Sequence, residues 1–176
     1  MKKIIFLLVL ILGISTGHAI DLEDNVKDFE RVKDWTSFSL VDSYFGRVLA
    51  TRAGTEDRRT EANLALTFPT NNKCILAPID IIIKVRAPIE EEYSGNIYGN
   101  TQIDNKPVKR VQAKIQNDAN SEFVFITILD KSYENEISNG KSMMVNFKGY
   151  GVIDFSLEGA KLAINTARNT CKKFSF

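Results

Sequence analysis

Few side chains in this sequence can serve nucleophilic or acid–base catalysis. The one histidine, His18, lies close to the N-terminus, in the segment STGHAI. Imidazole is the side chain whose ordinary pKa places its proton exchange between pH 5 and 8. Serine and cysteine triads and HExxH zinc peptidases depend on it. The protein could belong to one of these enzyme classes only if its mature form keeps His18.

The residues around His18 have the pattern of a secretory signal peptide. Lys2 and Lys3 give a short positive start, residues 4–12 are an unbroken apolar run, and small residues precede a cleavage point after Ala19. The apolar run is shorter than the roughly 20 residues that a permanent membrane-spanning helix needs. We predict cleavage after Ala19, loss of His18 and a location in the bacterial periplasm or outside the cell. An uncleaved N-terminal anchor is the alternative.

Removal of residues 1–19 leaves 157 of the 176 residues and a nearly neutral chain. The 23 basic residues fall to 21 with the loss of Lys2 and Lys3, against 22 acidic residues, so the formal charge changes from +1 to −1. This balance gives no global attraction to nucleic acid or to anionic lipid, although a local basic patch is compatible with it. No later apolar run reaches membrane-spanning length. The length fits one domain with its own core.

Cys74 and Cys171 are the only cysteines of the chain. In an exported protein an even pair typically forms a disulfide. Two free buried thiols or a metal pair are the alternatives, but two sulfurs without histidine fall short of the four ligands that zinc takes. We predict a structural disulfide between Cys74 and Cys171, no metal and no cofactor.

Carboxylates are the remaining candidates for catalysis. Acidic side chains gather at residues 90–92 and 130–136. Nothing in the sequence holds two of them at the separation of about 5–10 Å that glycosidases use. The central glycine of an EF-hand loop is absent, as are the glycine-rich motifs that bind phosphate. We therefore predict that the protein is not an enzyme, with a carboxylate-dependent hydrolase as the less favoured alternative.

One segment has the composition of a recognition loop. Residues 93–100, YSGNIYGN, combine tyrosine with glycine and asparagine. Tyrosine offers a large contact area at a low cost in conformational entropy, and it is frequent among residues that dominate binding energy. We predict a partner-binding loop that uses Tyr93, Asn96, Tyr98 and Asn100. The alternative is a structural hairpin whose tyrosines cover the sheet.

The elements that would position these residues are mostly strands. Segments rich in β-branched and aromatic residues, separated by asparagine, aspartate and glycine, are residues 36–42, 47–51, 63–68, 80–86, 108–115, 122–129 and 142–147. They predict a mainly β domain over residues 35–176, an antiparallel β-sandwich or barrel-like fold. Residues 20–34 are predicted to form an N-terminal arm or a short helix. Arg52, Arg58 and Arg59 are mixed with acidic residues, which is typical of an exposed loop.

The chain ends in a predicted helix with one buried stripe. The stripe residues recur in steps of four, three and four, at Ala160, Ile164, Ala167 and Cys171. Ser156 is the predicted N-cap. Because three of the four stripe residues are small, the helix can lie close to its partner surface. A bridge from Cys171 to Cys74 would attach the helix to the sheet.

Several of these segments resemble the bacterial invasion-associated locus B family. The resemblance rests on Asp34-Trp35-Thr36, on the segment QIDNKPV at residues 102–108 and, most specifically, on the ending FSLEGA followed by Ala163, Ala167 and Cys171. It implies a periplasmic or surface-associated domain similar to a β-sandwich, and it implies no catalytic residues. The chain departs from the family pattern soon after the tryptophan, where Phe38 and Ser39 stand in place of a further cysteine.

These observations predict a non-enzymatic binding or accessory protein of the bacterial envelope, with a possible link to host interaction. Its partner is predicted to be another envelope protein, not nucleic acid. An inhibitor or immunity protein, acting against a periplasmic toxin or a lysozyme, is the alternative. Both functions suit a small exported β domain with one disulfide.

Overall fold

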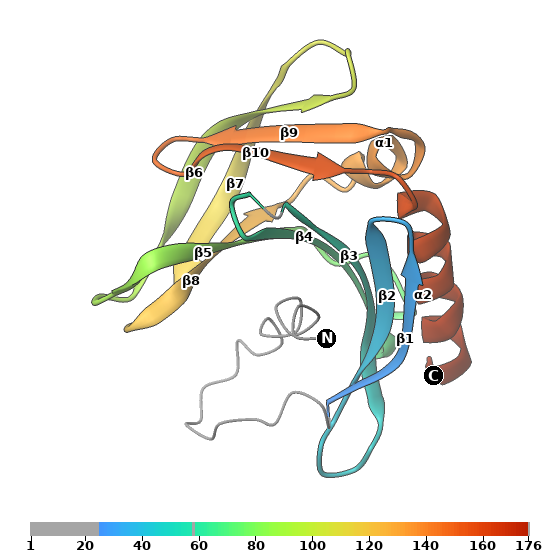
Figure 1. The fold of residues 1–176 in the computed structure, drawn as a ribbon. Coiled ribbons are helices and arrows are strands. Elements are labelled where there is room, and N and C mark those ends of the chain that lie inside the picture. The colour runs from blue at the N-terminus through green and yellow to red at the C-terminus, as the bar shows by residue number, and fades with distance from the viewer. Residues whose placement is uncertain (1–24, 58, 176) are drawn as a thin grey trace.

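The computed structural model describes residues 25–57 and 59–175, where ten strands hydrogen-bond into one sheet (Figure 1). The first strands along the chain are β1 (Val26–Val32), β2 (Trp35–Val41), β3 (Val48–Asp57), β4 (Ala62–Pro69) and β5 (Ile79–Ile89). The others are β6 (Tyr93–Ile103), β7 (Lys109–Asn117), β8 (Ser121–Ile128), β9 (Ser142–Phe147) and β10 (Gly151–Ser156). The helices are the 3-10 helix η2 (Thr70–Asn72), α1 (Tyr133–Asn139) and α2 (Ala160–Phe174). The predicted signal peptide, residues 1–19, lies outside the described residues.

The sheet is antiparallel throughout and curls on itself. Its strand order is β1-β2-β3-β4-β5-β8-β7-β6-β9-β10. The curl brings β9 and β10 across from β3, β4 and β5 (Figure 1). The Asp154 N–H of β10 donates a 3.1 Å hydrogen bond to the Asp57 carboxylate of β3, although these strands are not neighbours in the order. The predicted mainly β architecture with a C-terminal helix is therefore confirmed.

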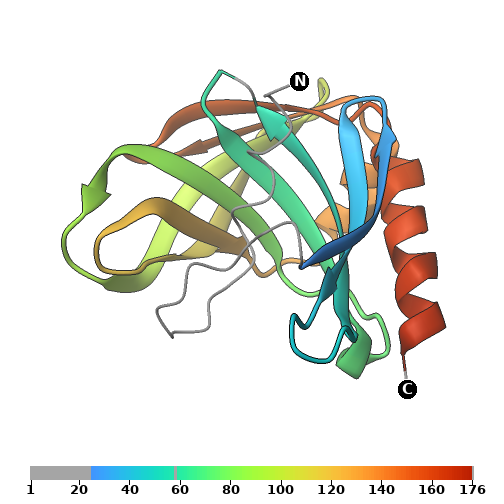
Figure 2. The ribbon, with the colours of Figure 1, turned by 60° about the horizontal axis from the view of Figure 1, so that its bottom comes forward.

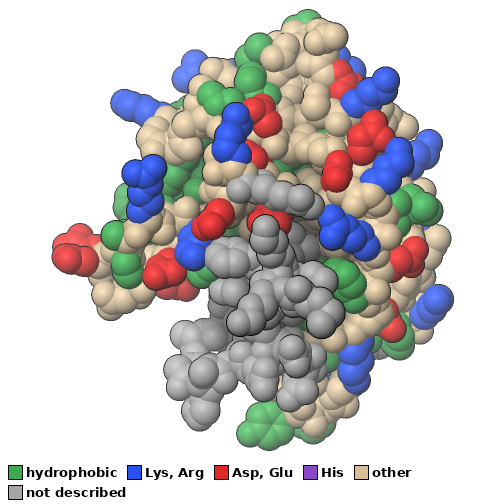
Figure 3. All heavy atoms as spheres, viewed as in Figure 1, with side chains coloured by type: hydrophobic (Ala, Val, Ile, Leu, Met, Phe, Trp, Pro, Cys, Tyr) green, Lys and Arg blue, Asp and Glu red, His purple; other side chains and the backbone are tan. Residues whose placement is uncertain are grey.

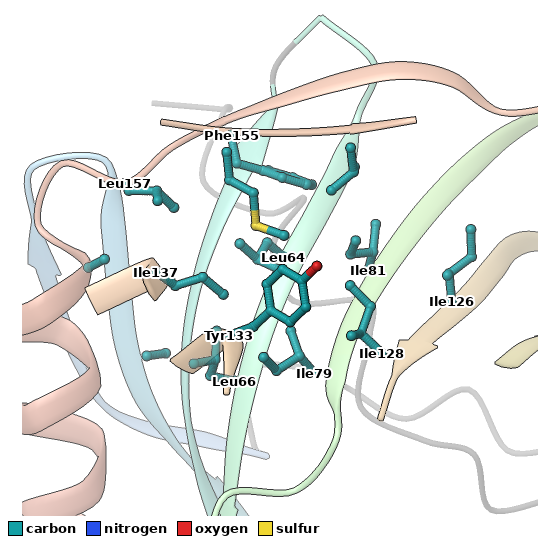
Figure 4. Packing of buried hydrophobic residues seen from close by; sticks show 14 of the residues in the cluster. Leu64, Leu66, Ile79, Ile81, Ile126, Ile128, Tyr133, Ile137, Phe155 and Leu157 are labelled. Carbon is teal, nitrogen blue, oxygen red and sulfur yellow. The ribbon is translucent and has the colours of Figure 1, made fainter. Parts of the chain in front are cut away.

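One face of the sheet, here called the core face, carries the main hydrophobic core. Alternate residues of the central strands point into it, among them Leu64 of β4 and Ile126 of β8, which are both fully buried. Tyr133 and Ile137 of α1 reach into the same cluster (Figure 4). The hydroxyl groups of Tyr133 and Thr101 share a buried hydrogen bond of 2.5 Å. The residues that alternate with these define the opposite face of the sheet.

Helix α2 also packs on the core face, beside β2 and β3 (Figure 2). Its buried side includes the whole predicted stripe, Ala160, Ile164, Ala167 and Cys171. The predicted disulfide is confirmed: Cys171 is bonded to Cys74, which follows η2, and their Cα atoms are 5.9 Å apart. The Thr51 hydroxyl of β3 donates a 2.6 Å hydrogen bond to the Ala167 carbonyl oxygen. The small stripe residues permit this close approach of helix and strand.

The start of α2 differs from the prediction. Ser156 ends β10 and is not the N-cap; Gly159 takes that position, with a φ of 99°. A Cβ atom at Gly159 would clash with the Val32 carbonyl oxygen. The Ser156 hydroxyl instead donates a 2.6 Å hydrogen bond to the Asp34 carboxylate. The β1–β2 turn therefore leaves room for glycine alone at the N-cap of the helix.

The N-terminal segment also differs, because residues 26–32 form the edge strand β1 rather than an arm or a helix. Val26, Phe29 and Val32 lie three apart in the sequence, a spacing that favours a helix, but the structure gives the spacing of the first two another cause. The register of β1 shifts between Lys27 and Glu30, at a bulge where Asp28 has a φ of 55°. A bulge inserts one extra residue, so Val26 and Phe29 both reach the opposite face. Phe29 stacks there on Phe38, with ring centroids 6.4 Å apart.

Candidate binding surface

The segment predicted as a partner-binding loop is a strand. Residues 93–100 belong to β6, which pairs with β7 from Tyr93 to Thr101. The glycines that favoured a loop serve packing instead. A Cβ atom at Gly99 would lie 2.5 Å from the Cδ1 atom of Phe147 and 2.7 Å from the Asn146 carbonyl oxygen. Glycine is therefore needed at residue 99, where β9 lies beside β6.

The strand separates the four predicted residues between the two faces of the sheet. Asn96, Tyr98 and Asn100 alternate onto the opposite face, where all three are exposed. Tyr93 lies on the core face, where its partner on β7 is the buried Asn117 and where the side chains of Val111 and Ile115 also point. Because successive residues of a strand point to opposite sides, Tyr93 cannot share a binding surface with the other three.

Tyr93 is half exposed at the start of β6. Its side chain lies over Gly95, where a Cβ atom would clash with the phenolic oxygen. Burial, and to a lesser degree the proximity of Tyr93, raises the pKa of the Tyr150 hydroxyl above its ordinary value. Tyr93 therefore lies near Gly95 and Tyr150, apart from the other three predicted residues.

The other three residues form part of a larger exposed array on the opposite face. We call this array the β6–β7 surface; it consists of Asn96, Tyr98, Asn100, Arg110, Gln112 and Lys114, all exposed. Register places Tyr98 beside Gln112, and the Arg110 guanidinium carbon lies 5.1 Å from the centre of the Tyr98 ring. A cation over a ring is favourable and orients both side chains.

The chemistry of the β6–β7 surface is that of recognition. Amide groups donate and accept hydrogen bonds, Tyr98 gives a large apolar face, and Arg110 and Lys114 give positive charge. The residues stand on paired strands, so little backbone entropy is lost when a partner binds. Arginine and tyrosine are the residue types most enriched among those that dominate protein interfaces.

The same face contains two oppositely charged residues, Arg52 and Asp80, whose relation the sequence did not predict. Arg52 of β3 donates a 2.9 Å hydrogen bond from Nε to the Thr67 hydroxyl, and Asp80 of β5 accepts one of 2.9 Å from the Thr127 hydroxyl. Burial raises the pKa of the Asp80 carboxyl and lowers that of the Arg52 guanidinium. The positive charge of Arg52 opposes the first shift, and the negative charge of Asp80 opposes the second. The expectation of an exposed loop at Arg52 was wrong, since cross-strand pairing places this residue within the sheet.

Register links this pair to the β6–β7 surface. Asp80 pairs with Thr127, Thr127 with Lys114, and Lys114 with Asn96. A polar row therefore crosses the opposite face from β5 to β6. Only knowledge of the strand order could have revealed it, because the four residues come from four separate segments of the chain.

The candidate carboxylates near α1 are engaged in ion pairs. Glu134 is paired with Arg168 of α2. Glu136 lies 2.5 Å from the Lys109 Nζ atom and 3.8 Å from that of Lys106. The described ranges contain no group of three histidine, cysteine, aspartate or glutamate side chains that could hold a metal ion. Nor, within those ranges, does any helix have the length and hydropathy to cross a membrane.

Comparison with known proteins gives a similarity of fold. No protein-family model matches the sequence, and no curated protein sequence matches it. Among solved structures, the fold is similar to that of invasion associated protein B from Bartonella henselae. The TM-score is 0.55 at 11% sequence identity, and the match covers 82% of this chain and 98% of that one. This is a structural relationship, in agreement with the resemblance seen in the C-terminal segment.

Proposed function

We propose that this chain is an exported, non-enzymatic binding protein of the bacterial envelope, which engages a protein partner through the β6–β7 surface. The observation that carries the proposal is the exposed array on paired strands around Tyr98 and Arg110, where the Arg110 guanidinium carbon lies 5.1 Å from the centre of the Tyr98 ring. Rigid aromatic and arginine side chains are the usual anchors of protein interfaces. The positive charge of Arg110 and Lys114 favours a partner with carboxylates at the contact.

Export to an oxidising compartment is supported by two independent features. The first 19 residues have the pattern of a cleavable signal, and the Cys74–Cys171 bridge is of the kind that persists outside the cytosol. The name of the structural neighbour associates that protein with invasion. We therefore favour an envelope role linked to host interaction. Fractionation of the source cells should find a periplasmic or secreted chain that begins at Ile20; an uncleaved cytosolic chain would contradict export.

A non-enzymatic role is supported by the chemistry of the candidate acids. Glu134 and Glu136 are held by Arg168 and Lys109, so their carboxylates serve as ion-pair partners. The mature chain predicted here also lacks imidazole. Hydrolysis of peptidoglycan or polysaccharide by the purified chain, abolished by one aspartate or glutamate substitution, would overturn this part of the proposal.

Photo-crosslinking in intact cells tests the binding surface. A photoreactive benzoylphenylalanine in place of Gln112 should give one discrete adduct, because Gln112 lies beside Tyr98. The matched control places the same group at Asn165, an exposed residue of α2. An adduct from Asn165 and none from Gln112 would locate the partner elsewhere and refute the assignment.

A further inference from the structure

The turn between β2 and β3 carries two strongly exposed aromatic rings. Tyr44 is 93% exposed and Phe45 is 73% exposed. Large apolar side chains at a protruding turn contribute nothing to the core, and clustered exposed ones commonly mark an interaction site. Figure 3 shows hydrophobic side chains at the end of the molecule where Figure 1 places this turn.

The turn holds these rings in a defined position. The Asp42 carboxylate accepts hydrogen bonds from the backbone N–H groups of Tyr44 at 2.8 Å and of Phe45 at 3.1 Å. Gly46, with a φ of 63°, closes the turn through a 2.8 Å hydrogen bond from its N–H to the Asp42 carbonyl oxygen. The Arg47 guanidinium carbon lies 5.4 Å from the centre of the Phe45 ring. The backbone that carries the two rings is therefore fixed by hydrogen bonds within the turn.

Two other segments reach the same end of the molecule. The Thr70 hydroxyl of η2 hydrogen-bonds the carbonyl oxygens of Val48 and Leu49 at the start of β3. The disulfide then joins the residues after η2 to the last turn of α2. Figure 2 shows the β2–β3 turn, η2 and the C-terminal end of α2 together. These segments add exposed apolar side chains, namely Leu49, Ile75 and Phe174.

Exposed cations lie on the same segments as these apolar side chains. The exposed cations at this end are Arg47, Lys73, Lys172 and Lys173. Asp42 is the acidic residue of the turn, and its carboxylate already accepts two backbone hydrogen bonds. Because the mature chain is predicted to be nearly neutral overall, this positive charge is a local feature. We call Tyr44, Phe45 and these four cations the basic–aromatic end.

We propose that the basic–aromatic end docks the protein on an anionic lipid bilayer. Tyr44 and Phe45 would enter the interface between headgroups and acyl chains, while the cations would meet lipid phosphates. Aromatic rings favour this interface, and each basic residue near an anionic surface adds attraction. A bilayer fits better than a protein pocket, because the rings stand on a protruding turn and exposed cations lie on the turn and on the neighbouring segments. The β6–β7 surface lies elsewhere on the fold (Figure 1), so both surfaces could act together.

Co-sedimentation with lipid vesicles tests this proposal. The chain from Ile20 onward should bind vesicles of phosphatidylcholine with phosphatidylglycerol, bind phosphatidylcholine alone weakly, and lose affinity as salt rises. This chain keeps three acidic residues near its start, Asp21, Glu23 and Asp24. Their negative charge opposes binding to anionic vesicles, so the measurement includes their effect. A wild-type chain that binds neither vesicle would overturn the proposal, whether or not a protein partner is found at this end.

Substitutions distinguish this end from the rest of the surface. The double variant Tyr44→Ala, Phe45→Ala should lower vesicle affinity at least about tenfold, and Lys172→Glu with Lys173→Glu should lower it by more than roughly fivefold per lysine. The matched control Tyr98→Ala removes an exposed tyrosine of the β6–β7 surface and should leave vesicle binding unchanged. Thermal unfolding of each variant establishes that it is folded. Equal binding by the wild type and by the Tyr44, Phe45 double variant would refute the assignment of the rings.

Discussion

Replacing both Cys74 and Cys171 by alanine should lower the free energy of unfolding by about 3–5 kcal/mol. The two cysteines are 97 residues apart in sequence, and closing a loop of this length restricts the unfolded chain by about 4.7 kcal/mol in the chain-entropy model. That value is an upper figure, because the unfolded chain without the bridge keeps some residual structure, so the bridge removes less entropy than the model assumes. Against a typical total stability of about 5–15 kcal/mol, the loss is large.

The bridge also fixes α2 on the sheet. Cys171 is fully buried in the last turn of the helix. The buried stripe of α2, from Ala160 to Cys171, covers part of the core beside β2, β3 and β4. Without the covalent link, the helix depends on the packing of small side chains. Ala160, Ala163 and Ala167 each bury little apolar area, so each contributes little to the hydrophobic stabilisation. The C-terminal end of α2 should therefore become the first region to open.

Urea unfolding followed by circular dichroism measures this effect. The double alanine variant should unfold at a lower denaturant concentration than the oxidised wild type. Reduced wild type keeps both sulfur atoms, so it separates the covalent link from the lost side-chain volume and should be destabilised to nearly the same degree. If reduced and oxidised wild type differ by less than about 1 kcal/mol, the chain-entropy reasoning is refuted.

Three further substitutions test other parts of the fold. Gly99→Ala should cost about 1–3 kcal/mol, because its Cβ would lie 2.5 Å from the Phe147 ring, and an unchanged thermal midpoint would contradict this packing. Trp35→Phe removes the 2.9 Å hydrogen bond from the indole N–H to the Ser156 carbonyl oxygen; we expect a loss of about 1–2 kcal/mol in urea unfolding. Hydrogen bonds from the backbone N–H groups of Lys141 and Ser142 hold the pKa of Asp104 below its ordinary value, so its contribution to stability is present above that value and is lost as the pH falls. Asp104→Asn should therefore flatten the decline in stability between neutral and acidic pH; an identical decline would contradict this role.

Features encoded by local sequence could be predicted. The stripe from Ala160 to Cys171 follows from helical spacing alone, and its burial needs no knowledge of the partner strands. The disulfide was predicted from one cysteine pair in a chain whose first residues have the pattern of an export signal. Most strands were found because β-branched and aromatic residues cluster in them. The helix α1 and the strand β10 were not predicted, since each is short and has a mixed composition.

Features created by long-range pairing could not be predicted. The bulge in β1 changes which residues share a face, so the spacing of Val26 and Phe29 was interpreted as helical. The composition of residues 93–100 indicated a loop, whereas pairing with β7 makes a strand and turns Tyr93 away from Tyr98. The relation of Arg52 to Asp80 depends on the order of β3, β4 and β5, which no local pattern encodes.

The affinity of two tyrosine variants for the crosslinked partner tests the central claim most directly. Tyr98 and Tyr93 lie on one strand, point to opposite faces, and are 52% and 53% exposed. Titration calorimetry should show that Tyr98→Ala raises the Kd by more than about fivefold, which corresponds to more than about 1 kcal/mol. Tyr93→Ala should leave the Kd unchanged. Equal effects of the two substitutions, or a larger effect at Tyr93, would contradict binding through the β6–β7 surface.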